Sequence, residues 1–273
     1  MRMLSLETVT FLLKLFLVPT FIGLVSLAGR RWGTTVSGWL IGLPLTSAPV
    51  AFILALEQGT LFAAKASEAI LLGIVSVYAF CVAYSWVAIR SGWVESALLG
   101  IFAFFVCTYI LNMVTLSLWI GCAFAILTLL VTLYLMPHVG PDRASPRRWR
   151  WEDPFRMVSA TALLFVVTGL ATLLGPQLTG LLTPFPIYAT TMGAFTHRSQ
   201  GGEEAVKLLR GIVIGTFTFI IFFLIISSTI VAWGLTASFL TGIGASFLIH
   251  STSLQILRSR IRPSKPRQRI RIE

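Results

Sequence analysis

The chain has 273 residues, of which 56% are hydrophobic and 11% are charged, and its mean hydropathy is +0.87. Ordinary soluble domains are excluded by these values, and several apolar stretches reach the roughly 20 residues that cross a hydrocarbon core. The sequence therefore predicts an all-α polytopic membrane protein. The net charge of +11 does not indicate nucleic acid binding, because the basic residues lie in short loops and between Arg258 and Arg271.

Nine apolar segments are expected to form membrane-spanning helices. They lie at about residues 7–28, 34–56, 62–89, 94–113, 115–136, 157–174, 177–197, 205–231 and 233–254. The first resembles a secretory signal, because Ser26-Leu27-Ala28 looks like a cleavage site. However, Arg30 and Arg31 follow directly and oppose export of that flank, so we expect an uncleaved span.

The longest polar interruption, His138–Arg156, is rich in proline and charge and indicates a loop between two halves. We therefore expect five regions. They are a first membrane repeat (1–113), a linker transmembrane helix (114–136), a cytoplasmic loop (137–156), a second, inverted repeat (157–257) and a basic cytoplasmic tail (258–273).

The two halves share an internal duplication. Residues 37–101 align without a gap on residues 179–243, so each residue of the first copy corresponds to the residue 142 positions later. Leu, Ile and Ala align easily by chance in apolar segments, whereas proline, glutamine-glycine and lysine do not. The informative matches are Pro44/Pro186, Gln58/Gln200, Gly59/Gly201, Lys65/Lys207 and Gly73/Gly215.

The positive charges predict the orientation. With nine spans, one side of the membrane holds three basic residues (Arg2, Lys14 and Lys65), and the other side holds the remaining eighteen. By the positive-inside rule the N-terminus lies outside and the C-terminus is cytoplasmic.

Duplication and topology together predict inverted repeats. A unit of four spans returns to the side on which it began, and the fifth span carries the chain across, so the second unit starts on the opposite face. Inverted repeats are the architecture of many secondary transporters, whose substrate site lies near the midplane where the repeats meet. Non-transporting proteins also arise by duplication, so this pattern favours transport without establishing it.

The second and seventh spans carry the candidate substrate site. Prolines at equivalent positions, Pro44 and Pro186, should break both helices at mid-depth, and paired interrupted spans indicate a transporter site. Hydroxyl groups next to these prolines would bind the substrate: Thr46, Ser47, Tyr188, Thr190 and Thr191. The structural alternative is that the prolines shape helix packing and the hydroxyls bond to their own helices.

Several polar residues near the ends of spans have simpler explanations. Gln58-Gly59 and Gln200-Gly201 fit helix caps better than a gate. Lys65 and Lys207 have glutamates at helical spacing and fit interfacial pairs. Glu68 lies about 9 Å inside its span, so it is the expected ion-coupling residue, although it could instead pair with Lys65 or Lys14.

Enzyme and metal sites are not expected. Asp142 and Asp153 both lie in the central loop, which excludes an intramembrane aspartyl protease, and Ser246 with His250 lacks an oxyanion site. The three cysteines are isolated, so they predict neither a metal site nor a disulfide framework. No phosphate-binding loop is present and no cofactor is expected.

The run Thr179-Gly180-Leu181, with Pro184-Phe185-Pro186 and Gly201-Gly202-Glu203 after it, resembles the GlpM family of small bacterial inner-membrane proteins. The resemblance covers residues 179–230 and, through the internal repeat, residues 37–90. Family members are single units of about three spans, so this chain would be an elaborated fused pair. The first unit departs from the pattern, with Gly42-Leu43-Pro44 at the corresponding place. The resemblance implies a bacterial inner membrane and little about substrate.

The sequence thus predicts a secondary transporter or permease for a small solute. Half-helix ends at the breaks suit an anionic or zwitterionic solute, while the scarcity of buried charge also allows a lipidic one. The alternative is a non-transporting scaffold of an envelope pathway. The expected partners are membrane lipids and a small-molecule substrate, without nucleic acid, and a homo-oligomer remains open.

Overall fold

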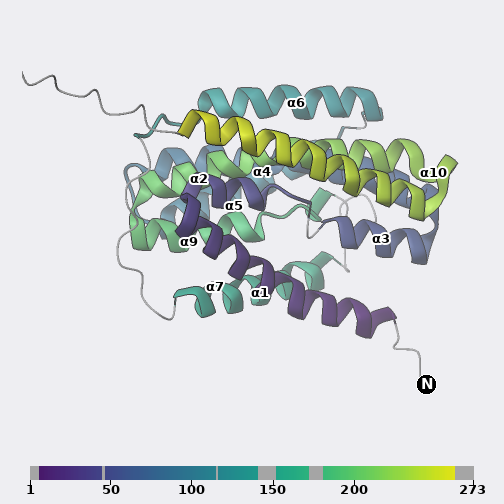
Figure 1. The fold of residues 1–273 in the computed structure, drawn as a ribbon, viewed down its shortest axis with the longest axis horizontal. Coiled ribbons are helices and arrows are strands. Elements are labelled where there is room, and N and C mark those ends of the chain that lie inside the picture. The colour runs from purple at the N-terminus through teal and green to yellow at the C-terminus, as the bar shows by residue number, and fades with distance from the viewer. Residues whose placement is uncertain (1–5, 45–46, 115, 141–151, 172–180, 262–273) are drawn as a thin grey trace, which may run out of the picture.

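The structure is a computed structural model, and it describes residues 6–44, 47–114, 116–140, 152–171 and 181–261. Every regular element within these ranges is an α-helix (Figure 1). The helices are α1 (Leu6–Trp32), α2 (Thr34–Ile41), α3 (Ser47–Gln58), α4 (Thr60–Ala88), α5 (Trp93–Asn112), α6 (Leu118–Leu135), α7 (Glu152–Ala171), α9 (Ile187–Gln200) and α10 (Gly202–Ile261).

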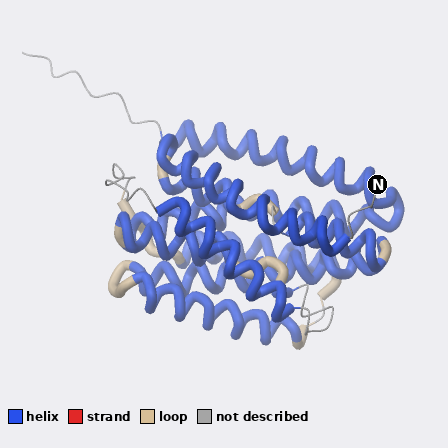
Figure 2. Tube along the Cα trace, turned by 90° about the horizontal axis from the view of Figure 1, so that it is seen from below, coloured by secondary structure: helices blue, strands red, loops and turns tan. Residues whose placement is uncertain are grey.

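The helices run along the long axis of the molecule, and most turns gather at its two ends (Figure 2). α4 lies at the centre, where it packs against α3, α5, α6 and α10. Its residues 70–78 are all buried, as expected for a helix that is apolar on all sides. α1 packs against α2 and α7 at the lower edge of Figure 1, and α6 covers the upper edge.

α10 consists of two arms. The helix is interrupted at Gly234, whose φ of 75° and ψ of 175° are not helical, and the chain turns back there (Figure 1). Only glycine adopts this backbone conformation at low cost. The predicted boundary between the eighth and ninth spans, near residue 232, therefore falls within two residues of the observed turn.

Four of the described helices, α4, α5, α6 and α10, are long and apolar enough to cross a membrane. Their outward side chains are also apolar. The exposed large hydrophobic residues include Leu98, Phe102 and Tyr109 on α5, Trp119, Leu127, Leu130 and Tyr134 on α6, and Leu240, Phe247 and Leu248 on α10. Such a surface is compatible with a protein embedded in lipid and would be a liability in water.

Candidate functional site: a cavity between two interrupted helices

The first interruption separates α2 from α3. α2 ends at Ile41, and its last turn is closed by hydrogen bonds from Gly42 N to Trp39 O and from Leu43 N to Leu40 O, both 3.2 Å long. Pro44 cannot donate the backbone hydrogen bond that would continue the helix. The chain becomes helical again at Ser47, where Ala48 N donates to Pro44 O at 2.8 Å.

The second interruption, before α9, has the same local design. Phe185 N donates to Leu182 O at 2.9 Å, and the chain is not helical at Phe185 and Pro186. Thr190 N then donates to Pro186 O at 2.7 Å, the counterpart of the bond from Ala48 to Pro44. The structure therefore interrupts both helices where the sequence predicts, and each proline carbonyl accepts from the first turn of the helix that follows.

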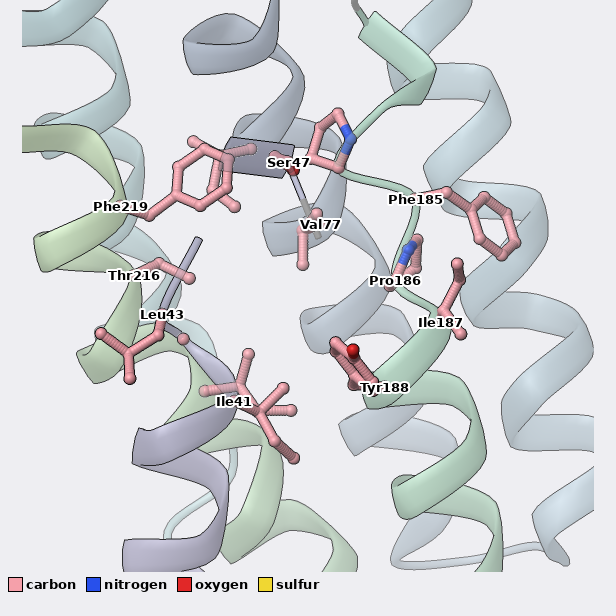
Figure 3. Close-up of a pocket in the computed structure, with 15 residues that line it drawn as sticks. Ile41, Leu43, Ser47, Val77, Phe185, Pro186, Ile187, Tyr188, Thr216 and Phe219 are labelled. Atoms are coloured by element: carbon pink, nitrogen blue, oxygen red, sulfur yellow. The ribbon is translucent and has the colours of Figure 1, made fainter. Parts of the chain in front are cut away.

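Both interruptions border one cavity of about 50 Å³ between α4 and α10 (Figure 3). The lining residues from the first interruption are Ile41, Gly42, Leu43 and Ser47, and those from the second are Pro184, Phe185, Pro186, Ile187, Tyr188 and Ala189. The remainder of the lining comes from Ile74 and Val77 of α4 and from Ile212, Thr216 and Phe219 of α10.

The polar side chains that line the cavity carry hydroxyls. Ser47 and Tyr188 are 1% and 6% exposed, and neither Ser47 Oγ nor Tyr188 Oη has a hydrogen-bond partner within the described residues. Thr216 differs, because its Oγ1 donates to Val213 O at 2.6 Å and lies 2.9 Å from the hydroxyl of Tyr78. A buried polar group without a partner costs free energy, so these two hydroxyls, on residues that line one cavity, are candidates to bind a molecule there.

A tight glycine contact holds α2 in position. Gly38 of α2 and Gly42, directly after its end, face Gly211 and Gly215 of α10, and a β-carbon on any of the four would overlap backbone atoms of the opposite segment. Small residues four apart allow this approach of two backbones in membrane helices. We call this contact the first seam.

A second seam lies on the other side of the cavity. A β-carbon built on Gly73 of α4 would lie 2.6 Å from Pro184 Cγ and 2.7 Å from Leu181 O. Here a proline ring, in place of a second glycine, occupies the space beside the glycine. The two interrupted helices are therefore each packed against a long helix, α2 on α10 and the turn before α9 on α4.

The predicted site residues are only partly brought together. Ser47, Pro186 and Tyr188 line the cavity. Pro44 is buried beside it, and Thr46 lies outside the described residues. Thr190 and Thr191 lie on α9 but are not among the lining residues, although Thr190 Oγ1 is also buried without a hydrogen-bond partner.

Glu68, the predicted ion-coupling residue, lies on α4 away from the cavity lining and is half-buried. Its carboxylate accepts a hydrogen bond of 3.3 Å from Ser227 Oγ, which also contacts Ala64 O at 3.1 Å. Lys65, one predicted partner, is exposed, and the side chain of Lys14 lies outside the described residues. The structure thus joins Glu68 to α10 through a serine.

One polar cluster was not foreseen from the sequence. At the start of α10, Glu204 and Lys207 form an ion pair of 2.5 Å, with their side chains 6% and 5% exposed. Thr34 Oγ1, at the start of α2, donates to the other carboxylate oxygen of Glu204 at 2.7 Å. The pair had been placed at the membrane interface by its helical spacing, and Thr34, 170 positions away, gives no local signal of its role. We call these three residues the Glu204 cluster.

Arg210, the counterpart of Glu68, has a different function in the fold. Its guanidinium donates to the carbonyl oxygens of Leu133, Met136 and Pro137 at 3.1 to 3.2 Å. These carbonyls lie at the end of α6, where a helix lacks internal donors and carries partial negative charge. Arg210 therefore caps α6 and ties it to α10.

The described residues contain no group of three or more His, Cys, Asp or Glu side chains that could hold a metal ion. Comparison of the chain with models of known families, with curated proteins and with solved structures finds no match. The resemblance to the GlpM family thus stays a prediction from the residues quoted above.

Proposed function

We propose that the protein is a secondary transporter or permease that passes a small solute through the cavity between the two interrupted helices. The observation that carries the proposal is that both interruptions, 142 residues apart in sequence, border the same cavity, and each supplies a lining residue whose buried hydroxyl has no hydrogen-bond partner among the described residues. Interrupted helices at membrane depth are tolerated where they line a cavity, and paired interruptions are typical of transporter sites.

We further propose that the chain is built from two inverted repeats. The local geometry at equivalent positions supports a repeat: Gly59 (φ 86°, ψ 170°) and Gly201 (φ 96°, ψ 168°) share one backbone conformation before α4 and α10. Packing supports it as well. A β-carbon on Gly100 would lie 2.9 Å from Phe80 Cδ2, and one on Gly242 would lie 3.1 Å from Phe222 Cδ2.

Polar contacts inside the two units also correspond. Thr108 Oγ1 donates to Ser76 Oγ at 2.9 Å, and at the positions 142 residues later His250 Nδ1 lies 3.2 Å from Thr218 Oγ1. The first contact joins α4 to α5, and the second joins the first arm of α10 to its second arm. The residue types have changed while the contact has been kept, which is what a diverged duplication leaves behind.

The direction of the helices in the first seam supports inversion. Thr34 contacts Glu204, Gly38 faces Leu208 and Gly42 faces Gly215, so α2 and the first arm of α10 run parallel. α2 belongs to the second span of the first unit, and the first arm of α10 is the third span of the second unit. Consecutive spans run in opposite directions, so these two helices would be antiparallel if both units had the same orientation. They are parallel if the second unit is inverted. The equivalents of Gly42 and Gly215 in the opposite units are Pro184 and Gly73, and these two residues are also in contact.

For the location we propose a bacterial inner membrane, with the N-terminus outside and the C-terminus cytoplasmic. Support comes from the charge distribution and from Figure 1, in which α1 begins at one end of the bundle and α10 finishes at the other. The basic residues Arg30, Arg198 and Arg210 then lie towards the cytoplasmic side.

The proposal is tested by flux into vesicles reconstituted with the purified protein. Solute uptake that exceeds the uptake of protein-free vesicles, and that falls at least tenfold in Tyr188→Phe, supports transport through the cavity. Tyr109→Phe on the exposed face of α5 is the matched control. The scaffold alternative predicts no flux above that of protein-free vesicles, and it predicts that cellular function survives loss of the cavity hydroxyls but depends on residues 137–156 or 258–273.

A further inference from the structure

The cavity lining bears on the charge of the solute. Among the described residues that line the cavity there is no Asp, Glu, Lys, Arg or His. The charged side chains of the nearby helices contact other groups: Glu204 pairs with Lys207 and Thr34, Arg210 binds the end of α6, and Glu68 accepts from Ser227. The buried Arg156 of α7 does not line the cavity either, since its guanidinium contacts Met192 Sδ at 3.8 Å and lies over the ring of Phe195 on α9. A solute with a full charge would therefore find no side chain of opposite charge, and burial of an unpaired ion costs several kcal/mol.

Helix ends do not replace the missing side chain. A helix terminus carries the equivalent of about half a charge, positive at the N-terminus and negative at the C-terminus. At the first interruption the C-terminus of α2 and the N-terminus of α3 border the same cavity, through Gly42 and Ser47. The two partial charges of the first interruption have opposite signs and largely cancel for a solute that is small enough to lie between them. The N-terminus of α9 also borders the cavity, through Ile187, Tyr188 and Ala189, and its partial positive charge of about half a unit falls short of the full charge that would balance an anion.

The hydroxyls define what the solute must offer. Ser47 Oγ and Tyr188 Oη are each able to donate one hydrogen bond and to accept others. Both are buried and lack protein partners within the described residues. A bound molecule satisfies them best when it carries both donors and acceptors, such as the N–H and C=O groups of an amide.

The volume of the cavity limits the size of the solute. A cavity needs roughly 10–15 Å³ to hold one water molecule, so about 50 Å³ accommodates roughly four groups of that size. Much of the surrounding surface is aliphatic, from Ile41, Leu43, Ile74 and Val77, and cannot replace the hydration shell of an ion.

We propose that the cavity selects a small uncharged solute of the amide or urea class, held by the hydroxyls of Ser47 and Tyr188. This inference rests on the proposed transport function and narrows it, because the half-helix ends alone had favoured an anionic or zwitterionic solute. The aliphatic walls would exclude ions by their desolvation cost, while the two hydroxyls would replace the water lost by a neutral polar molecule.

Urea and nitrate make a matched pair of probes, because both are planar and have the same number of non-hydrogen atoms while only nitrate is charged. We would measure the volume change of vesicles containing the protein after mixing with urea, with potassium nitrate in the presence of valinomycin, or with glycine. We expect urea flux at least tenfold above that of protein-free vesicles, and no added flux of nitrate or glycine. Tyr188→Phe and Ser47→Ala should each lower urea flux at least tenfold, whereas Tyr109→Phe and Ser228→Ala, which lie on exposed faces, should not.

The outcomes separate this inference from transport itself. Flux of nitrate or glycine that Tyr188→Phe abolishes would overturn the uncharged solute class and leave the transport function standing. Absence of flux for all three solutes would overturn both. Urea flux that persists in correctly folded Tyr188→Phe and Ser47→Ala proteins would show that urea does not use this cavity. If either variant fails to fold, Ala189→Leu fills the same cavity from α9 and should block urea in its place.

Discussion

The two seams that flank the cavity have similar backbones and different chemistry. In the first seam, glycine meets glycine along α2 and α10, and the Glu204 cluster joins the two helices at one end. In the second seam, Pro184 packs on Gly73, and Lys65, the counterpart of Lys207, is exposed. The close backbone approach is alike in the two seams, while a buried ion pair lies at the first seam only.

This difference suggests which parts of each half are constrained. A break in the helix and a close approach to the neighbouring long helix occur in both halves, and both breaks border the cavity. The ion pair is required in one half only, where it fixes the short helix α2 at its start. α2 has eight residues and cannot form a stable helix without such external contacts.

The largest difference between the halves should appear when the two lysines are replaced. Lys207→Met leaves the carboxylate of Glu204 buried without its cation, so we expect a loss of about 3–5 kcal/mol in the free energy of unfolding. Lys65→Met removes an exposed charge and should leave it unchanged. Unfolding in mixed detergent micelles measures both. A double variant, Glu204→Gln with Lys207→Met, should recover most of the loss. Equal losses for the two lysine variants would show that the halves are electrostatically alike.

The next largest effect should come from the glycines of the first seam. Gly215→Ala places a methyl group against the backbone of Trp39 and Gly42, and we expect a loss of about 1–3 kcal/mol. Gly244→Ala, on the second arm of the same helix, has open space around its β-carbon and should gain about 0.5–1 kcal/mol from helix propensity. Gly73→Ala tests the second seam, where the proline ring leaves as little room. A gain in stability for Gly215→Ala would contradict the close contact of α2 with α10.

The prolines should affect function more than stability. Pro44→Ala and Pro186→Ala restore a backbone donor and favour a continuous helix, which would reshape the cavity. We expect normally inserted protein with at least tenfold weaker flux, equivalent to about 1.4 kcal/mol. Full activity in both variants would make the interruptions a feature of packing alone.

The smallest structural effect is expected for Glu68→Gln. The amide oxygen of glutamine still accepts the hydrogen bond of Ser227, so the free energy of unfolding should change by less than about 0.5 kcal/mol. If flux is coupled to an ion gradient, however, this variant should lose the coupling, because it cannot exchange a proton or bind sodium as a carboxylate does. Flux with unchanged dependence on pH and sodium would make Glu68 a structural link between α4 and α10.

Much of the fold could be read from the sequence because lipid imposes simple rules. Helix lengths, the turn near residue 232 and the interruptions at Pro44 and Pro186 follow from apolar length, glycine and proline, which act locally. The cavity was anticipated in part, through Ser47 and Tyr188, because these residues adjoin the prolines. Thr216 was missed because it lies within the continuous, apolar first arm of α10 and meets the cavity only through packing.

The burial of the Glu204 cluster could not be predicted from the sequence. Glutamate and lysine three residues apart on a helix are usually a solvated surface pair, and burial depends on what covers them. Here the cover is the start of α2, brought close by the four glycines of the first seam. No local sequence pattern predicts the contact between Thr34 and Glu204, which are 170 positions apart.

The inverted repeat underlies the whole account, and the sidedness of two equivalent turns tests it most directly. The turns at Gly59 and Gly201 correspond in sequence and lie at opposite ends of the bundle in Figure 1. Single cysteines introduced at these positions, after replacement of Cys81, Cys107 and Cys122, can be labelled with an impermeant maleimide in intact cells and in inverted vesicles. We predict that the cysteine at 59 reacts only from outside and the cysteine at 201 only from the cytoplasmic side. Labelling of both from the same side would contradict the inverted repeat and remove the main support for transport.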